Sequence, residues 1–268
     1  MDTAYEFFLE HGRYPMVDRG EKPWAYCGWL RVMVQLVHAY DDDVPNRWGY
    51  FQQVSEGRLP TEGIPEIVWL SAPDSSGMKQ IEQAINHIAA AGFGSWGGFG
   101  RFIQWLGFGL DIPKCQDPGF SDELNDKLYR TFNAQVWLQN PYDYLGSYLA
   151  ESQGSGKNWN PNAFYPTPMS ICQLMIEMQM GDARGDQRLQ SVMDPCVGSG
   201  RLLLVASNRS LLLYGQDIDP LMVDICNING LLYAPWMVYS PKMKAEGQIT
   251  VKAKKRPPPK KRRPPRRT

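Results

Sequence analysis

Three short segments, at residues 164–168, 194–200 and 215–219, combine glycine, hydroxyl and carboxylate groups in a spacing suited to a polar ligand. Glycine has no side chain, so its backbone can approach a ligand closely, and the N-terminus of a following helix presents free N–H groups to that ligand. Asp217 lies 23 positions after Asp194. At about that spacing, a Rossmann-like site has the acidic residue that binds ribose hydroxyls. The pattern indicates a nucleotide-like ligand.

Apolar runs predict the elements that position the glycine segment and Asp217. A short strand at 191–193 leads into the glycine segment, and a helix runs from Arg201 to about Ala206. A second strand at 211–214 precedes residues 215–219. The order of strand, glycine loop, helix and strand is typical of an α/β fold.

A further helix is predicted directly after the first segment. Thr167 can cap this helix, and Pro168 suits its first turn. Apolar side chains then recur at the i, i+3, i+4 and i+7 positions, so the helix is amphipathic. These side chains are Ile171, Leu174, Met175 and Met178.

Residues 140–236 resemble the methyltransferase domain of the modification subunit of type I restriction-modification systems, within the N6-adenine DNA methylase family. The three segments occur in the order and spacing of that family: Phe-Tyr-Pro-Thr-Pro at 164–168, Asp-Pro-Cys-Val-Gly-Ser-Gly at 194–200 and Gly-Gln-Asp-Ile-Asp at 215–219. The run 142–149 also resembles the helical lead-in of the family.

The resemblance implies that S-adenosylmethionine is the cofactor. The first segment would contact its methionine end, the glycine loop would wrap its sugar and amino-acid moieties, and the third segment would hold ribose and adenine. The cofactor-binding residues implied in this way are Phe164, Tyr165, Thr167, Asp194, Pro195, Cys196, Gly198, Ser199, Gly200, Asp217 and Ile218.

One family motif is missing from the sequence. Such an enzyme flips the target adenine out of the duplex and holds it with the tetrapeptide Asn/Asp-Pro-Pro-aromatic, on the fourth strand of its sheet. Pro-Pro occurs here only at 257–259 and 264–265, and neither run follows an Asn or Asp. Asn140-Pro141-Tyr142 lacks the second proline and precedes the glycine loop. We therefore predict no catalytic residue.

We expect an α/β fold in three parts. A mostly helical N-terminal domain covers 1–135, a partial Rossmann-like methyltransferase sheet covers 136–251, and a disordered basic tail covers 252–268. A third strand is expected around 248–251 and no fourth, so one edge of the sheet is left open. The N-terminal domain, a second copy or a protein partner must then cover that edge.

The N-terminal part contains two predicted helices, at 29–38 and at 78–91, with a candidate strand at 67–70 between them. Asp74-Ser75-Ser76 offers N-caps for the second helix. Residues 92–97 formally match the dinucleotide fingerprint Gly-x-Gly-x-x-Gly, but a helix precedes them, so we expect the match to be accidental. Nearby aromatic residues are expected in a core or an interface: Phe93, Trp96, Phe99, Phe102, Trp105 and Phe108.

Charge is distributed unevenly along the chain. Ten Lys and Arg residues and no acid lie between Lys252 and Thr268, which leaves 18 basic against 28 acidic residues elsewhere, a net charge of −10. A basic tail on an acidic body suggests a DNA contact through Lys252 to Arg267. A localisation patch or a simply solvated tail are the alternatives.

Several classes of protein are disfavoured by composition. The five cysteines are scattered without a Cys-x-x-Cys pair, which indicates neither a disulfide framework nor a metal site. No apolar run approaches the length of a membrane span, and the N-terminus lacks a signal-peptide pattern. We expect a soluble, cytoplasmic protein without membrane contact.

Three functional hypotheses follow from the sequence. The chain is an S-adenosylmethionine-binding member of the adenine-N6 DNA methyltransferases, in which methyl transfer requires another chain to supply the base-holding motif. Alternatively, it is a catalytically inactive nucleic-acid-binding or assembly subunit. The third possibility is a truncated gene product.

Overall fold

The computed structural model describes residues 22–154, 164–181, 186–243 and 249–250. The tail at 252–268, for which disorder and a DNA contact are predicted, lies outside them. The elements, in chain order, are η1 (Pro23–Ala25), α2 (Trp29–Tyr40), α3 (Arg47–Ser55), α4 (Ser75–Ile88), η2 (Ala89–Phe93), α5 (Ser95–Gly109), α6 (Asp122–Thr131), α7 (Ala134–Gln139), α8 (Tyr144–Gly154), α9 (Met169–Met180), β1 (Ser191–Asp194), α10 (Arg201–Ala206), β2 (Leu212–Gly215), α11 (Pro220–Tyr233), η3 (Pro235–Met237), β3 (Lys242–Met243) and β4 (Ile249–Thr250).

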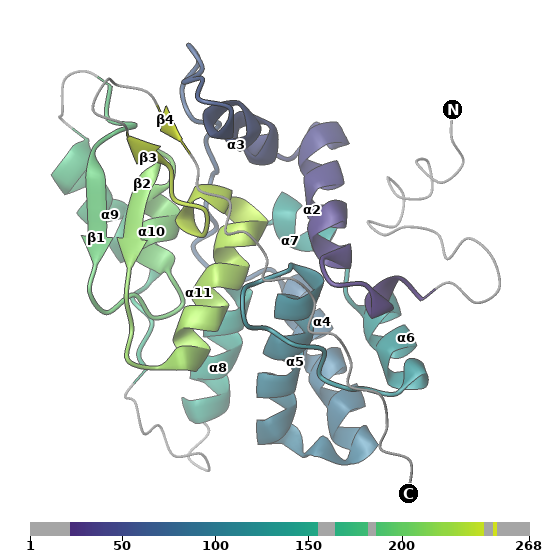
Figure 1. Cartoon of the computed structure of the whole chain (residues 1–268). Coiled ribbons are helices and arrows are strands. Elements are labelled where there is room, and N and C mark those ends of the chain that lie inside the picture. Colours follow the sequence, from purple (N-terminus) through teal and green to yellow (C-terminus); the bar gives the residue numbers. More distant parts are fainter. Residues whose placement is uncertain (1–21, 155–163, 182–185, 244–248, 251–268) are drawn as a thin grey trace, which may run out of the picture.

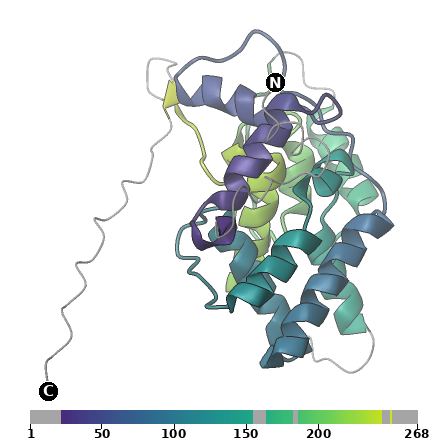
Figure 2. The same ribbon diagram turned by 90° about the vertical axis from the view of Figure 1, so that its right-hand side faces the viewer.

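The described chain is mostly helical and carries one small parallel sheet. In Figure 1, β1, β2 and α9–α11 gather on one side of the molecule, while α2, α4, α5 and α6 lie on the other. Figure 2, turned by 90°, brings these N-terminal helices in front of the strands. Each helix in the described ranges is too short or too polar to cross a lipid bilayer.

The two strands predicted around the glycine loop are present. β1 pairs in parallel with β2, in a register that sets Ser191 opposite Leu212 and Asp194 opposite Gly215. The helix predicted at 201–206 has the predicted bounds. An α/β arrangement is therefore plausible, whereas a Rossmann-like sheet stays a prediction, because β1 and β2 are the only members of this sheet among the described residues.

Of two further strand predictions, the one around 249 is right about the strand but wrong about its sheet, and the one at 67–70 is wrong. β4 pairs antiparallel with β3 in a separate two-stranded sheet, so the region around 249 does not extend the parallel sheet. Residues 67–70 form no strand, because side-chain and loop groups bond to their backbone where a neighbouring strand would. Asn208 accepts a hydrogen bond from the Ile67 N–H (3.1 Å) and donates one to the Ile67 carbonyl (2.8 Å), and the Leu70 N–H donates to the Pro141 carbonyl (3.1 Å).

The N-cap predicted for the second N-terminal helix is present. The Asp74 carboxylate accepts hydrogen bonds from the N–H groups of Ser76 (2.8 Å) and Gly77 (3.2 Å), so α4 begins three residues earlier than predicted. Residues 92–97 span the end of η2 and the start of α5, so a helix rather than a strand precedes them, as predicted for an accidental match. Phe99, Phe102 and Trp105 are buried, as a core role requires.

A single hydrophobic core runs through both the N-terminal and the C-terminal parts. Three side chains tie the parts together through backbone carbonyls. A ring nitrogen of His38 lies 2.8 Å from the Leu232 oxygen, Trp48 donates to the Leu231 carbonyl (3.0 Å), and Tyr233 donates to the Trp137 carbonyl (3.1 Å). A domain boundary at 135–136 stays a prediction.

The amphipathic helix α9 has an unexpected orientation. Its four predicted stripe residues are exposed, whereas Met169, Cys172, Ile176 and Met180 are buried on α9. The exposed fractions of the stripe are Ile171 44%, Leu174 54%, Met175 38% and Met178 78%. α9 packs on α10 through its buried face, and the described residues leave the predicted stripe exposed.

Part of one face of the parallel sheet is also exposed. Val192 and Leu213 are buried on the face toward α10, whereas Met193 and Tyr214, which are register partners, are about half exposed. The exposed stripe of α9 and the Met193 and Tyr214 side chains are large apolar or aromatic groups that the described residues leave exposed.

The orientation of α9 predicts opposite outcomes for two substitutions. Ile176→Ala should lower the free energy of unfolding by about 2–5 kcal/mol, because it leaves a cavity in the core. Met178→Lys should change that free energy by less than about 0.5 kcal/mol, because its side chain lies in solvent. Urea denaturation measures both, and a large loss for Met178→Lys would contradict the orientation.

Candidate functional site

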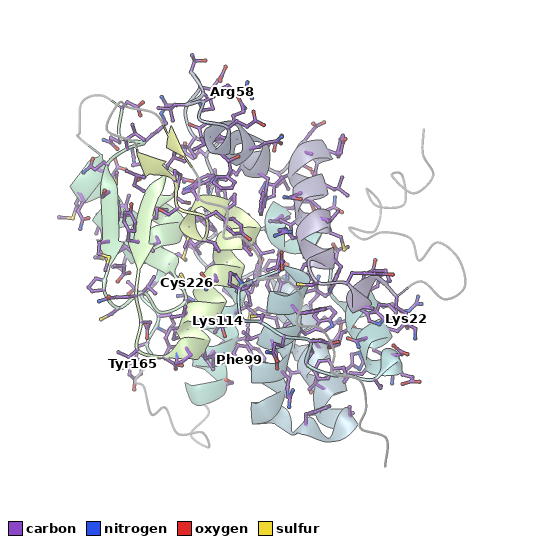
Figure 3. All side chains as sticks on the ribbon, viewed as in Figure 1. Lys22, Arg58, Phe99, Lys114, Tyr165 and Cys226 are labelled. Atoms are coloured by element: carbon purple, nitrogen blue, oxygen red, sulfur yellow. The ribbon has the colours of Figure 1, made fainter. Side chains whose placement is uncertain are left out.

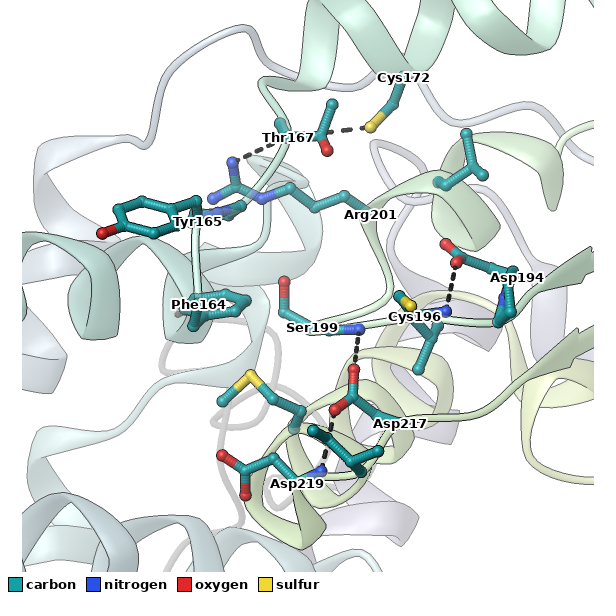
Figure 4. A pocket seen from close by; sticks show the side chains of 17 residues that line it. Phe164, Tyr165, Thr167, Cys172, Asp194, Cys196, Ser199, Arg201, Asp217 and Asp219 are labelled. Carbon is teal, nitrogen blue, oxygen red and sulfur yellow. Dashed lines mark hydrogen bonds between the residues drawn. The ribbon is translucent and has the colours of Figure 1, made fainter. Parts of the chain in front are cut away.

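A cavity of about 340 Å³ lies at the carboxyl ends of β1 and β2. Figure 4 shows side chains from all three predicted segments converging on it. Of the predicted site residues, Phe164, Tyr165, Thr167, Asp194, Pro195, Cys196, Gly198, Ser199, Asp217 and Ile218 line the cavity. Gly200 does not, and Cys172, Arg201, Asp219 and Met222 are lining residues that the sequence did not single out.

The parallel pairing brings the glycine loop and the acidic turn together. The Gln216 N–H donates to the Asp194 carbonyl (3.1 Å), and the Val197 N–H donates to the Gln216 carbonyl (2.9 Å). The two loops that leave the strands are thus joined directly at the sheet edge. Two segments about 20 residues apart in sequence form one wall of the cavity as a result.

The glycine loop needs glycine at two positions for different reasons. Gly198 and Gly200 have φ of 52° and 95°, a left-handed region that residues with a Cβ rarely adopt. A Cβ at Gly198 would lie 3.2 Å from the Phe164 ring. A Cβ at Gly200 would lie 2.9 Å from the Cys226 sulfur, so Gly200 allows α10 to pack on α11 rather than facing the cavity.

Carboxylates hold the loops through backbone N–H groups. Asp217 accepts from the Gly198 N–H and from the Asp219 N–H, each at 2.9 Å. Asp194 accepts from the Cys196 N–H at 3.0 Å. A carboxylate offers about four acceptor sites, so Asp217 and Asp194 keep acceptor capacity toward the cavity. That capacity suits hydroxyl or ammonium donors of a ligand.

Behind the cavity lies a buried carboxylate, Asp143, that receives four hydrogen bonds. Its Oδ2 atom accepts from the Ser199 hydroxyl (2.5 Å) and from Arg201 Nε (2.7 Å). Its Oδ1 atom accepts from the Gly146 N–H and from Asn229 Nδ2, each at 2.9 Å. The Ser199 hydroxyl is thus directed into this network rather than toward a ligand.

The buried arginine of the network connects three parts of the site. Besides Asp143, Arg201 donates to the Thr167 carbonyl (3.1 Å) and to the Ser147 hydroxyl (2.7 Å), and its guanidinium lies 5.5 Å from the Tyr142 ring. Thr167 is therefore positioned by its backbone. Arg201 links the first segment to α8 and to the glycine loop.

Sequence reasoning missed Asp143, Arg201 and Asn229. One signal was available for Arg201, since a cation in the first turn of a helix opposes the helix dipole and needs an anion nearby. No comparable signal identified its partner, because Asp143 lies 58 residues earlier in the chain.

The cysteine thiols near the cavity differ in their degree of burial. Burial raises the pKa of Cys172 to about 11 and that of Cys226 to about 12. Cys196, in the glycine loop, is exposed. At the cavity mouth the apolar side chains of Tyr165 (81% exposed) and Ile218 (91% exposed) lie open to solvent. A ligand with an apolar or aromatic part would cover them.

The Asp143–Arg201 pair should be a main determinant of stability. Arg201→Met leaves the Asp143 carboxylate buried without its cation, so we expect the free energy of unfolding to fall by about 3–5 kcal/mol. The matched control is Arg209→Met, since Arg209 pairs with Glu177 at the surface and should contribute less than about 1 kcal/mol. Urea denaturation measures both free energies of unfolding, and equal losses for the two variants would refute the difference between the buried and the surface pair.

Comparison with known proteins supports part of the predicted family resemblance. A model of the N-6 DNA Methylase family matches residues 135–235, which include α8, the glycine loop and the acidic turn. No curated protein and no solved structure matches the chain significantly. The match covers less than half of the chain, and the narrower resemblance to type I modification subunits stays a prediction. Residues 135–235 are thus similar to N6-adenine DNA methyltransferases.

Proposed function

We propose that the cavity at the ends of β1 and β2 binds S-adenosylmethionine. The observation that carries the proposal is the convergence of three separate segments on one cavity at the carboxyl ends of two parallel strands. Ligands of open α/β sheets bind at that edge. The family match at 135–235 supports the same cofactor, since N6-adenine methyltransferases use it as methyl donor.

The charges around the cavity fit the cationic donor. Three carboxylates line it, Asp194, Asp217 and Asp219, and its one arginine among the described lining residues is paired with Asp143. S-adenosylmethionine carries a positive sulfonium and a positive ammonium group, which carboxylates attract. When bound, it supplies an electrophilic methyl group.

Within this assignment each segment has a separate task. Asp217 accepts hydrogen bonds from the ribose hydroxyls, and Asp194 faces the amino-acid moiety. Gly198 lets the ligand approach the loop, because no side chain intervenes. Phe164 and Tyr165 cover the methionine end and exclude water from it.

Catalysis on DNA needs a group that this sequence does not contain. The target amine must be held in line with the methyl group, and the 268 residues carry no Asn/Asp-Pro-Pro-aromatic motif. We therefore propose a cofactor-binding subunit of a methyltransferase of the type I modification class, in which another polypeptide holds the target adenine. An inactive nucleic-acid-binding or assembly subunit is the alternative.

The uncovered apolar surface on α9 and β1 favours a protein partner. Four apolar side chains of α9 and the Met193 side chain of β1 are exposed, and β1 has β2 as its single neighbour in the described chain. A strand with a free edge and nearby apolar groups can receive a further strand. The basic tail would add a contact with DNA phosphates.

The test begins with calorimetric titration of S-adenosylmethionine into the protein. A labelled-methyl transfer assay on adenine-containing DNA follows, with the same sample. We expect binding without transfer. Absence of binding would refute the cofactor site, and transfer by the isolated chain would refute the need for another polypeptide.

Substitutions in the loops should weaken cofactor binding. Asp217→Ala removes charged acceptors, so affinity should fall by about tenfold to hundredfold. The affinity of Gly198→Leu should fall at least as far. The residue at this position has a left-handed backbone conformation, and the new side chain would meet the Phe164 ring. The control is Asp42→Ala, an exposed acid outside the cavity lining, which should bind normally. Wild-type affinity in both loop variants would disprove the assignment.

The cysteines provide a second readout. Iodoacetamide should alkylate Cys196 quickly and Cys226 slowly, because burial keeps the Cys226 thiol protonated. Saturating S-adenosylhomocysteine should slow alkylation of Cys196 alone. Cys27, which is exposed and outside the cavity lining, is the internal control, and mass spectrometry measures each site. Equal rates at Cys196 with and without ligand would contradict the site.

A further inference from the structure

A half-open groove of about 570 Å³ lies between α2 and α3, which we call the α2–α3 groove. It is separate from the cavity at the strand ends, because the two have no described lining residue in common. Figure 3 places Arg58, just after α3, and Tyr165, at the mouth of that cavity, at opposite ends of the molecule. An occupant of the α2–α3 groove would therefore be distinct from the cofactor.

One wall of the groove is a face of α2 that the rest of the described chain leaves partly uncovered. Apolar or aromatic side chains recur there at the i, i+4, i+7 and i+8 positions, so they share one face of the helix. They are Val32, Leu36, Ala39 and Tyr40. Val32 is 46% exposed and Tyr40 is 54% exposed. Large apolar groups that gather on one surface, unlike scattered ones, indicate an interaction site.

The other wall of the groove is an aromatic side of α3. Trp48 and Phe51 line it, and their rings meet edge to face with centroids 6.1 Å apart. With Tyr40 on the facing helix, three aromatic residues line one groove. Aromatic-lined grooves receive proline-rich segments in several peptide-binding domains.

The loop between α2 and α3 gives one end of the groove a negative charge. Tyr40 and Asn46, on either side of residues 41–45, both line the groove. Within this loop Asp42 and Asp43 are exposed, and their carboxylates pair with no cation among the described residues. The carboxyl-terminal end of α2 adds the negative end of a helix dipole. This end of the groove should attract Lys and Arg side chains.

The C-terminal part of the described chain lies beside the same groove. The Tyr239 ring stacks on the groove residue Phe51, with centroids 6.3 Å apart. Figure 1 shows β4 next to α3, and the two are in contact. The 18 residues at 251–268 follow β4 directly and contain ten Lys and Arg residues and five prolines. A segment of that length can span up to about 60 Å, and α3 is about 14 Å long, so the tail can reach the whole groove.

We propose that residues 251–268, the basic and proline-rich tail of the same chain, occupy the α2–α3 groove. The prolines pack on Tyr40 and the apolar face of α2, and Lys and Arg side chains lie against Asp42 and Asp43. The groove offers aromatic and anionic groups side by side, which matches the two residue types of the tail. Attachment beside the groove gives the tail a high effective concentration there, so modest contacts suffice. The proposal does not depend on the cofactor assignment.

Occupation of the groove has a consequence for the DNA contact proposed above. The cations of the tail can lie against these carboxylates or against DNA phosphates, but not against both at once. The groove therefore competes with DNA for the tail, and duplex DNA displaces the tail from the groove. Binding to the chain itself lowers the affinity of the free protein for DNA.

Zero-length cross-linking of the full chain tests which segment occupies the groove. A carbodiimide joins a lysine amine to a carboxylate in contact with it, and mass spectrometry of the peptides identifies the pair. We expect links from lysines between Lys252 and Lys261 to Asp42 or Asp43. Glu82 and Glu151, exposed acids outside the groove lining, should give at least about tenfold fewer links. Equal yields at the two pairs of acids, or none at Asp42 and Asp43, would overturn the proposal.

Isotope labelling separates the tail of the same chain from that of a second copy. An equal mixture of ¹⁴N-labelled and ¹⁵N-labelled protein is cross-linked in the same way. We expect each linked peptide pair to carry a single label at every protein concentration. Mixed labels in the statistical proportion would assign the groove to the tail of a second copy and contradict occupation within one chain.

Neutralising the acidic end of the groove should free the tail for DNA. We expect the double variant Asp42→Asn/Asp43→Asn to bind a short DNA duplex about threefold to tenfold more tightly than wild type at low salt. The matched control is Glu82→Gln/Glu151→Gln, which changes the net charge equally at exposed acids outside the groove and should gain less. Fluorescence anisotropy measures both, and equal affinities of the two double variants would refute the competition between groove and DNA.

Discussion

The buried carboxylate of Asp143 is the constraint on which the candidate site depends. Removing a charge from water costs several kcal/mol unless other groups replace the lost hydration. Here four donors do so, from the glycine loop, α10, α11 and the start of α8. Because these donors belong to four different elements, few arrangements of the chain satisfy Asp143. The glycine loop is held in one conformation as a result.

The same network connects stability to the shape of the cavity. Arg201 binds Asp143 with one nitrogen and the Thr167 carbonyl with another, so the first segment is fixed relative to the glycine loop. The Ser199 hydroxyl donates to Asp143 within the network. The polar groups that remain open toward the cavity are therefore the carboxylates and the backbone of the glycine loop. Asp143, which lies outside the cavity lining, thus helps to decide where the lining residues Ser199 and Arg201 lie.

The N-terminal helices do more than pack beside the sheet. α5 and the loop after it line a second cavity beside the candidate site, together with α11. His38 and Trp48 hold these helices against α11 through its backbone carbonyls. The apolar surface on α9 lies away from this contact, so the N-terminal part leaves it uncovered.

Local features of this protein were predictable from its sequence, and distant pairings were not. The strands beside the glycine loop, the helix at 201–206 and most of the cavity lining follow from glycine positions, caps and short apolar runs, which act within a few residues. Periodicity located both faces of α9 but not the buried one, because that depends on packing against α10. The candidate strand at 67–70 failed because Asn208, about 140 residues later, satisfies its backbone. Only the tertiary structure joined Asp143 to Arg201 and placed α5 beside α11, since both bring together residues whose separation in sequence carries no local signal.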